Sequence, residues 1–183
     1  QLSSANSINI GRLVPQVVYY VYAYAKLLAN GEIAKDEKVN VVVPTGNFGN
    51  ILAAYFAKQM GVPFGKLICA SNDNKVLYDF FKTGVHDKNR PFILTSSPSM
   101  DILISSNLER LIYLSTGCDA EETKKRMEEL SKDGKYSVTD EMRARMADFV
   151  GGYADQAANA AEIKRLYDET GYMIDTHTGV ASC

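Results

Sequence analysis

A valine-rich segment, Val39–Val43, ends at a proline and is followed by a glycine-containing turn and a helical pattern. A mostly β-branched run bounded in this way is typical of a strand buried in a parallel sheet. The same order recurs at a spacing of about 27 residues, which predicts an open parallel sheet with right-handed crossovers. The predicted strands are Val39–Val43, Lys66–Ser71 and Phe92–Thr95. The first helix between them is Ile51–Met60. The second is capped by Asn72–Asn74, runs through Lys82 and is closed by Gly84.

A helix is predicted before the sheet, over Ile10–Ala29, with Ser7 in position to cap it. Pro15 falls inside this helix, and we expect a kink or a restart there because the proline ring clashes with the preceding turn. Val17–Tyr24 is apolar on nearly every face. Such a pattern indicates a helix that is buried on several sides.

The second half of the chain is predicted to be rich in helices. Gly151-Gly152 is expected to break the helical pattern, and Met173-Ile174 is expected to form a last short strand. The predicted helices are Pro98–Leu114, Ala120–Lys132, Asp140–Phe149 and Ala154–Glu169. The fold class is therefore α/β, an open parallel sheet with flanking helices and Rossmann-like βα repeats. No linker divides residues 1–183, which we expect to form a single domain.

The charge and composition exclude several classes of function. The formal charge is −2 and the basic clusters are interleaved with acids, so we expect no nucleic-acid partner. Two histidines, and three cysteines without CxxC spacing, predict no metal site, and the sparse cysteines indicate a reducing compartment. The sequence has no run long enough to cross a membrane and no signal peptide, so we expect a cytoplasmic protein. It starts at Gln1 and ends just after a turn, which indicates a piece of a longer chain.

Thr45–Asn50 joins the first predicted strand to the next helix, at the edge where open α/β sheets bind ligands. Gly46 and Gly49 permit positive φ angles and a close approach of backbone amides to an anion, and the helix that follows adds its positive end. A phosphate monoester fits this chemistry. A plain strand-to-helix turn that needs glycines is the alternative. The segment is not a P-loop, which needs Gly-Lys-Ser/Thr, and it lacks the third glycine of a dinucleotide fingerprint.

Four segments in order along the chain resemble the threonine synthases, which belong to the tryptophan-synthase-β-like enzymes that use pyridoxal 5'-phosphate (PLP). Asn50 stands where members often have Asp, and Thr176 and Gly179 replace the family's Pro and Ala. The resemblance covers nearly the whole chain, which we expect to lack the N-terminal part and the extreme C-terminus of such an enzyme. The segments are Ser4-Ala5-Asn6-Ser7-Ile8-Asn9 with Arg12, Pro44-Thr45-Gly46-Asn47-Phe48-Gly49-Asn50, Ser97-Pro98-Ser99-Met100-Asp101-Ile102 with Ser105–Arg110, and Asp175-Thr176-His177-Thr178-Gly179-Val180-Ala181.

The resemblance implies roles for two groups of residues. Those implied to hold the PLP phosphate are Gly46, Asn47, Phe48, Gly49 and Asn50, and those implied to line the cleft near substrate are Asn6, Ser7, Asn9 and Arg12. Capping of the first helix is the alternative role for the second group.

Three further roles concern the later segments. We expect Asp101 to cap its own helix. We expect Asn107, Glu109 and Arg110 to form a salt-bridged surface, and His177 to be a turn residue bonded to backbone rather than a catalytic base.

The resemblance also implies a lysine that reacts with the PLP aldehyde, in a Phe-Lys-Asp context before the start of this sequence. No such tripeptide occurs here, because Phe81-Lys82 is followed by Thr83, so no catalytic residue is assigned within the chain. The implied parent enzyme converts O-phospho-L-homoserine and water to L-threonine and phosphate. We expect the chain alone to be inactive and to bind PLP weakly at best.

The rest of its own chain is the expected partner, and apolar surface left exposed without it favours self-association. A non-catalytic α/β phosphate- or nucleotide-binding module is the alternative, and another PLP enzyme such as a threonine dehydratase or a cysteine synthase is a weaker one.

Overall fold

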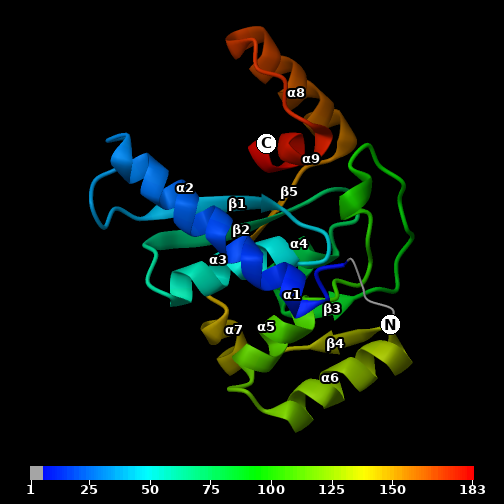
Figure 1. The fold of residues 1–183 in the computed structure, drawn as a ribbon. Helices are drawn as coiled ribbons and strands as arrows, with labels where there is room; N and C mark the ends of the chain where they lie inside the picture. The colour runs from blue at the N-terminus through cyan, green and yellow to red at the C-terminus, as the bar shows by residue number, and fades with distance from the viewer. Residues whose placement is uncertain (1–5) are drawn as a thin grey trace, which may run out of the picture.

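A computed structural model describes residues 6–183, and Figure 1 shows a sheet flanked by helices, with a separate pair of short strands below it. The first half contains α1 (Ile10–Leu13), η1 (Val14–Gln16), α2 (Val17–Ala29), β1 (Val39–Pro44), α3 (Gly49–Gln59), β2 (Phe64–Ser71), α4 (Val76–Thr83) and β3 (Val85–Asp87). The second half contains η2 (Pro98–Met100), α5 (Leu108–Ser115), α6 (Ala120–Asp133), β4 (Lys135–Ser137), α7 (Asp140–Arg145), β5 (Phe149–Tyr153), α8 (Gln156–Thr170) and α9 (Thr176–Ser182). No helix within residues 6–183 is both long and apolar enough to cross a bilayer.

The α/β fold class is confirmed. The main sheet is parallel and has the strand order β1-β2-β5, so β2 lies in the centre. Helix α3 connects β1 to β2, as the βα pattern predicts. One core cluster joins the sheet to α2, α3, α4, α5 and α7, and its fully buried side chains include Leu13, Phe48, Ile51 and Phe80.

The prediction of the third strand is wrong. Phe92–Thr95 forms no strand, because side chains take up its backbone groups: the amide of Ile93 donates to Asn74 Oδ1 and that of Thr95 donates to Asp101 Oδ2. The third strand is instead β5, which contains the Gly151-Gly152 pair that we expected to be a break. A Cβ on Gly151 would lie 3.0 Å from Tyr78 Cα, so a glycine here lets α4 pack closely on the strand.

Several helix boundaries also differ from the predictions. The predicted helix Pro98–Leu114 is a single 3₁₀ turn, η2, followed by a loop and then by α5, because the Asp101 carboxylate holds the loop against Thr95, Asn72 and Asn74. The predicted helix Asp140–Phe149 stops at Arg145. Met173-Ile174 is not a strand but leads into α9. A further feature that was not predicted is the antiparallel pairing of β3 with β4, two short strands that η2, α5 and α6 separate in sequence.

The first helix is interrupted where a kink was predicted. Pro15 lies in the 3₁₀ turn η1, between α1 and α2. Burial of α2 on several sides is not observed within the described residues: Tyr24 is its buried residue, whereas Val18 and Tyr22 are 62% and 61% exposed. The two helices therefore present a mostly apolar outer face to solvent.

Candidate functional site

The candidate site is the turn between β1 and α3, at the carboxyl end of the parallel strands. Thr45 continues the strand pairing, since its amide donates to the carbonyl of Ala70 over 2.9 Å, and its side chain is buried with Oγ1 donating to the carbonyl of Val43. The backbone then leaves the sheet and enters α3 at Gly49. This placement matches the ligand edge of open α/β sheets.

The backbone amides of this turn are unpaired. From Gly46 through Ile51, no amide donates a hydrogen bond within residues 6–183; the next one, of Leu52, donates to the carbonyl of Phe48 over 3.1 Å. The amides of the first helical turn have no intrahelical partner, and here the amides of the preceding loop are added to them. Successive free donors at the positive end of a helix favour an oxyanion with several acceptor oxygens, of which a phosphate monoester is an example.

Glycine is required at two positions of the turn by close packing. A Cβ on Gly46 would lie 2.3 Å from the carbonyl oxygen of Ser99. A Cβ on Gly49 would lie 2.6 Å from Cβ of Ser7 and 3.4 Å from Nδ2 of Asn107. Both contacts are made by segments far from the turn in sequence. These segments therefore fix the shape of the turn.

Phe48 contributes to the turn through its backbone. It has φ +64°, in the left-handed region, which reverses the chain just before α3. Its ring is 1% exposed and packs against the rings of Phe149 and Phe81, at centroid distances of 5.6 and 6.0 Å. The ring thus belongs to the hydrophobic core, and only the backbone amide of Phe48 is left to meet a ligand.

Asn50 is exposed, and its side chain links α3 to the first helices. Its Nδ2 donates to Oε1 of Gln16 over 3.0 Å, and its Oδ1 accepts from the hydroxyl of Tyr20. One of the two Nδ2 hydrogens is used in this way, and the backbone amide of Asn50 has no partner within residues 6–183. Asn47, by contrast, is half-buried, and its side chain forms no hydrogen bond with another described residue.

The N-terminal segment supplies one side chain to the turn. Ser7 lies against Gly49, and its hydroxyl accepts from Nε2 of Gln16 over 3.2 Å. Asn9, rather than Ser7, caps α1, because its Oδ1 accepts from the amide of Gly11. Oδ1 of Asn6 accepts from the amide of Ile8. Arg12 is exposed, and the motif's first residues, Ser4 and Ala5, lie outside the described residues.

Asn107 and Arg110 do not form the surface cluster that was expected. Asn107 is 0% exposed, and both its backbone amide and its Nδ2 donate to the carbonyl of Asn47, over 3.1 and 2.9 Å. Arg110 donates to Oδ1 of Asn107 and to the carbonyl of Ile8. Ser105, to which the sequence assigned no role, donates to the carbonyl of Gly46 over 2.6 Å. Its place in the Ser105–Arg110 motif was the only sequence signal for it.

Asp101 does not cap a helix, because its carboxylate accepts from Thr95, Asn72 and Asn74. Burial raises the pKa of this carboxyl, and the hydrogen bonds from Thr95, Asn72 and Asn74 outweigh burial, so that the net pKa is lowered. His177 is bonded to backbone as expected: its Nε2 accepts from the amide of Ser99 over 3.1 Å, while Nδ1 lies 3.1 Å from Asp175. These contacts hold the segment that packs on Gly46.

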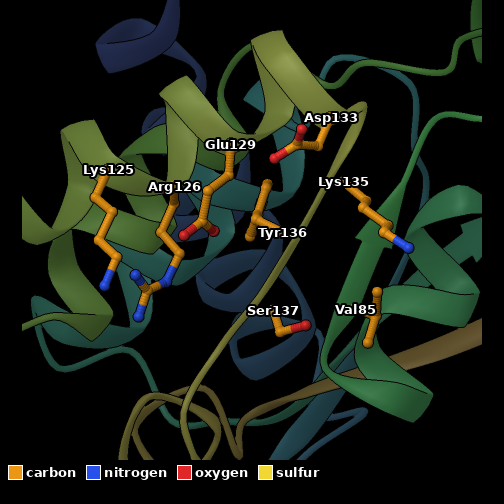
Figure 2. A pocket seen from close by; sticks show the side chains of 8 residues that line it. All are labelled: Val85, Lys125, Arg126, Glu129, Asp133, Lys135, Tyr136 and Ser137. Atoms are coloured by element: carbon orange, nitrogen blue, oxygen red, sulfur yellow. The ribbon is translucent and has the colours of Figure 1, made fainter.

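A second place with positive charge lies between α6 and the β3–β4 strand pair. Figure 2 shows Lys125 and Arg126 beside Glu129 in this open hollow of about 800 Å³, to which the turn contributes no residue. Arg126 is 6% exposed; its guanidinium lies 3.1 Å from Glu122, and its Nε has no partner among the described residues. The hollow mixes both signs of charge. The turn after β1, by contrast, offers consecutive unpaired amides and contains no acidic residue.

Sequence comparison finds relatives that align with nearly the whole chain. The chain is 46% identical to human "Threonine synthase-like 1" over 182 residues, which is 98% of this chain and 24% of that protein. It is 38% identical to "Threonine synthase" of Saccharomyces cerevisiae over an alignment of 196 residues, which covers all of this chain and 38% of the relative. No family model matches the chain.

Solved structures agree with these sequence relatives. The crystal structure of PLP-bound threonine synthase from Brucella melitensis superposes with a TM-score of 0.92 at 39% identity, covering 98% of this chain and 38% of that one. Threonine synthase from yeast gives a TM-score of 0.90 at 37% identity. The chain thus spans between 24% and 38% of the length of these relatives.

Proposed function

We propose that this chain, which belongs to the family of threonine synthases and threonine synthase-like proteins, forms the PLP-phosphate cradle of a longer PLP-dependent lyase. The proposed reaction converts O-phospho-L-homoserine and water to L-threonine and phosphate. The observation that carries the proposal is the run of unpaired backbone amides from Gly46 through Ile51 at the ligand edge of the sheet. This cradle fits the phosphate of PLP, and a structural relative is described as PLP-bound.

The residues of this chain bind and orient the cofactor in this proposal. PLP, when bound, supplies an electron sink for chemistry at the substrate carbons. The amides of Gly46, Asn47, Phe48, Gly49 and Asn50 hold its phosphate, and the positive end of α3 adds to the attraction. The predicted substrate residues are Asn6, Ser7, Asn9 and Arg12, and of these Ser7 touches the turn, at Gly49.

The proposed function is tested by comparing the full-length protein with the 183-residue chain. Both are supplied with PLP and O-phospho-L-homoserine, and phosphate release and threonine formation are measured. We expect turnover by the full-length protein and none by the chain alone, because no lysine here occupies a Phe-Lys-Asp context; Lys82, which follows Phe81, lies with its ammonium 5.6 Å from the ring centre of Tyr78. Turnover by the isolated chain, or a full-length protein that does not bind PLP, would contradict the proposal.

A second candidate function rests on the same unpaired amides, which bind a phosphate without any catalytic residue. In it the phosphate site is kept but the protein is a non-catalytic phosphate-binding module. The same assay separates the two candidates. A full-length protein that binds phosphate compounds but forms no threonine supports the second one.

We further propose that residues 1–183 act as one domain, because one core cluster joins elements from α2 to α7. The proposed location is the cytoplasm: the three cysteines are unpaired, as in a reducing compartment, although Cys118 and Cys183 are exposed. Its proposed partners are the small phosphorylated substrate and the rest of the longer chain, with no nucleic acid and no membrane.

The apolar face of η1 and α2 is proposed to pack against the rest of the longer protein. Val14, Val18, Tyr19 and Tyr22 are each more than half exposed on it. We therefore expect the isolated chain to self-associate in sedimentation velocity as its concentration rises. The double variant Val18→Glu/Tyr22→Glu is expected to remain monomeric at concentrations where the parent chain associates.

The matched control is Ala157→Glu/Ala160→Glu, which adds the same charges to exposed positions of α8 and is expected to associate like the parent chain. A chain that is monomeric at every concentration, or a control that dissociates equally, would show that the face does not drive association.

A further inference from the structure

We propose that Ser105 and Asn107 are positioning residues that aim the amides of Asn47 and Phe48 at the bound phosphate. The inference rests on the proposed function and deepens it, since it states how the cradle is held in its binding shape. Ser105 and Asn107 lie 59 and 60 residues beyond the groups that they contact. Neither is expected to touch the ligand.

The geometry of the peptide unit links each carbonyl to the following amide. A trans peptide is planar, so its C=O and the N–H of the next residue point in opposite directions. All peptide bonds within the described residues are trans. Fixing the carbonyl of Gly46 therefore fixes the direction of the Asn47 N–H, and fixing the carbonyl of Asn47 fixes that of the Phe48 N–H.

Both carbonyls are held from the same side of the turn. The Ser105 hydroxyl donates to the carbonyl of Gly46 over 2.6 Å. Asn107 donates to the carbonyl of Asn47 twice, through its backbone amide over 3.1 Å and through Nδ2 over 2.9 Å. The amides of Asn47 and Phe48 consequently point away from α5, and they are among the donors that have no partner within residues 6–183.

The contacts of Asn107 explain why this position needs an amide side chain. Asn107 is 0% exposed, and its Oδ1 accepts from Arg110, so both ends of its side chain are used. Arg110 also donates to the carbonyl of Ile8 over 2.8 Å, next to Ser7, which packs on Gly49. The N-terminal segment and the start of α5 thus hold the turn together. An aspartate at 107 would keep the shape but would place an acceptor against the carbonyl of Asn47.

The test compares Ser105→Ala and Asn107→Asp in the full-length protein, with affinities measured for both PLP and pyridoxal, which lacks the phosphate. Ser106→Ala is the matched control, because Ser106 is adjacent to both residues and its buried Oγ has no partner among the described residues. We expect each test variant to bind PLP about tenfold more weakly, as the loss of one aimed donor to an anion implies, with pyridoxal affinity unchanged. The ³¹P resonance of bound PLP is also expected to shift in both variants and not in the control.

The outcomes separate the inference from the proposed function. Affinities like those of Ser106→Ala overturn the positioning roles, and so does an equal loss for PLP and pyridoxal, which would indicate general damage to the fold. Ser105→Ala keeps the test valid where Asn107→Asp fails to fold, since it removes a single hydroxyl. A parent protein that binds PLP no better than pyridoxal overturns the proposed phosphate site itself.

Discussion

Replacing Gly46 with alanine in the full-length protein is expected to weaken PLP binding by about 10- to 100-fold, as an overpacking cost of 1–3 kcal/mol implies. The added Cβ would lie 2.3 Å from the carbonyl oxygen of Ser99, a backbone atom that cannot rotate away. The amide of Ser99 is itself bonded to His177, so the opposing segment is held in place. The turn must therefore move, and its amides then no longer point toward the same phosphate.

The effect is measured by titrating the apo protein with PLP and following the absorbance of the bound cofactor. Gly152→Ala is the control, because Gly152 also lies at the carboxyl end of a strand of the sheet, but its Cβ would meet its nearest neighbour, Ile68, at an ordinary 3.5 Å. We expect near-normal binding by the control. Equal affinity of the Gly46 variant and the unmodified protein would show that the turn does not hold the phosphate.

Replacing Phe48 with alanine is expected to lower the free energy of unfolding by about 3–5 kcal/mol, the usual cost of truncating a buried phenylalanine. The ring is 1% exposed and packs against the rings of Phe81 and Phe149, which also stack on each other. The measurement is urea denaturation of the full-length protein. Phe92→Ala is the control, since that ring is 52% exposed, and we expect a change within about 0.5 kcal/mol.

The conservative variant Phe48→Leu separates the stability role from the binding role. It refills most of the core volume and keeps the backbone amide, so the folded protein is expected to bind PLP with unchanged affinity. Loss of PLP binding in a stable Phe48→Leu protein would mean that the ring contacts the cofactor. A Phe48→Ala variant as stable as Phe92→Ala would contradict the core role.

The β1–turn–α3 unit and the α/β class could be predicted from sequence, because they depend on local signals: a valine-rich run, a proline, and glycines before a helical pattern. The third strand could not. Phe92–Thr95 has strand-like composition, but the side chains of Asn74 and Asp101 take up its backbone amides. Gly151-Gly152 indicates a break locally, yet packing against Tyr78 makes glycine the residue that fits inside β5. Both errors arise from contacts with residues outside the segments themselves, which a local pattern does not show.

The candidate site likewise has one part that could be predicted from sequence and one that could not. The turn that offers the amides is continuous in sequence and was predicted to bind an anion. The side chains that hold its carbonyls, Ser105 and Asn107, could not be found from local pattern, because an Asn before an apolar helix more often suggests a solvated cap. Their motif was visible only through family resemblance. The roles of these residues became clear only from the three-dimensional contacts, which show Asn107 buried rather than in the predicted surface cluster.

A crystal structure of the full-length protein with PLP bound tests the central claim most directly. The expected result places the phosphate oxygens within about 3 Å of backbone amides between Gly46 and Ile51, with the carbonyls of Gly46 and Asn47 still held by Ser105 and Asn107. A phosphate bound elsewhere, for example against Lys125 and Arg126 in the hollow of Figure 2, with the turn after β1 empty, would contradict it.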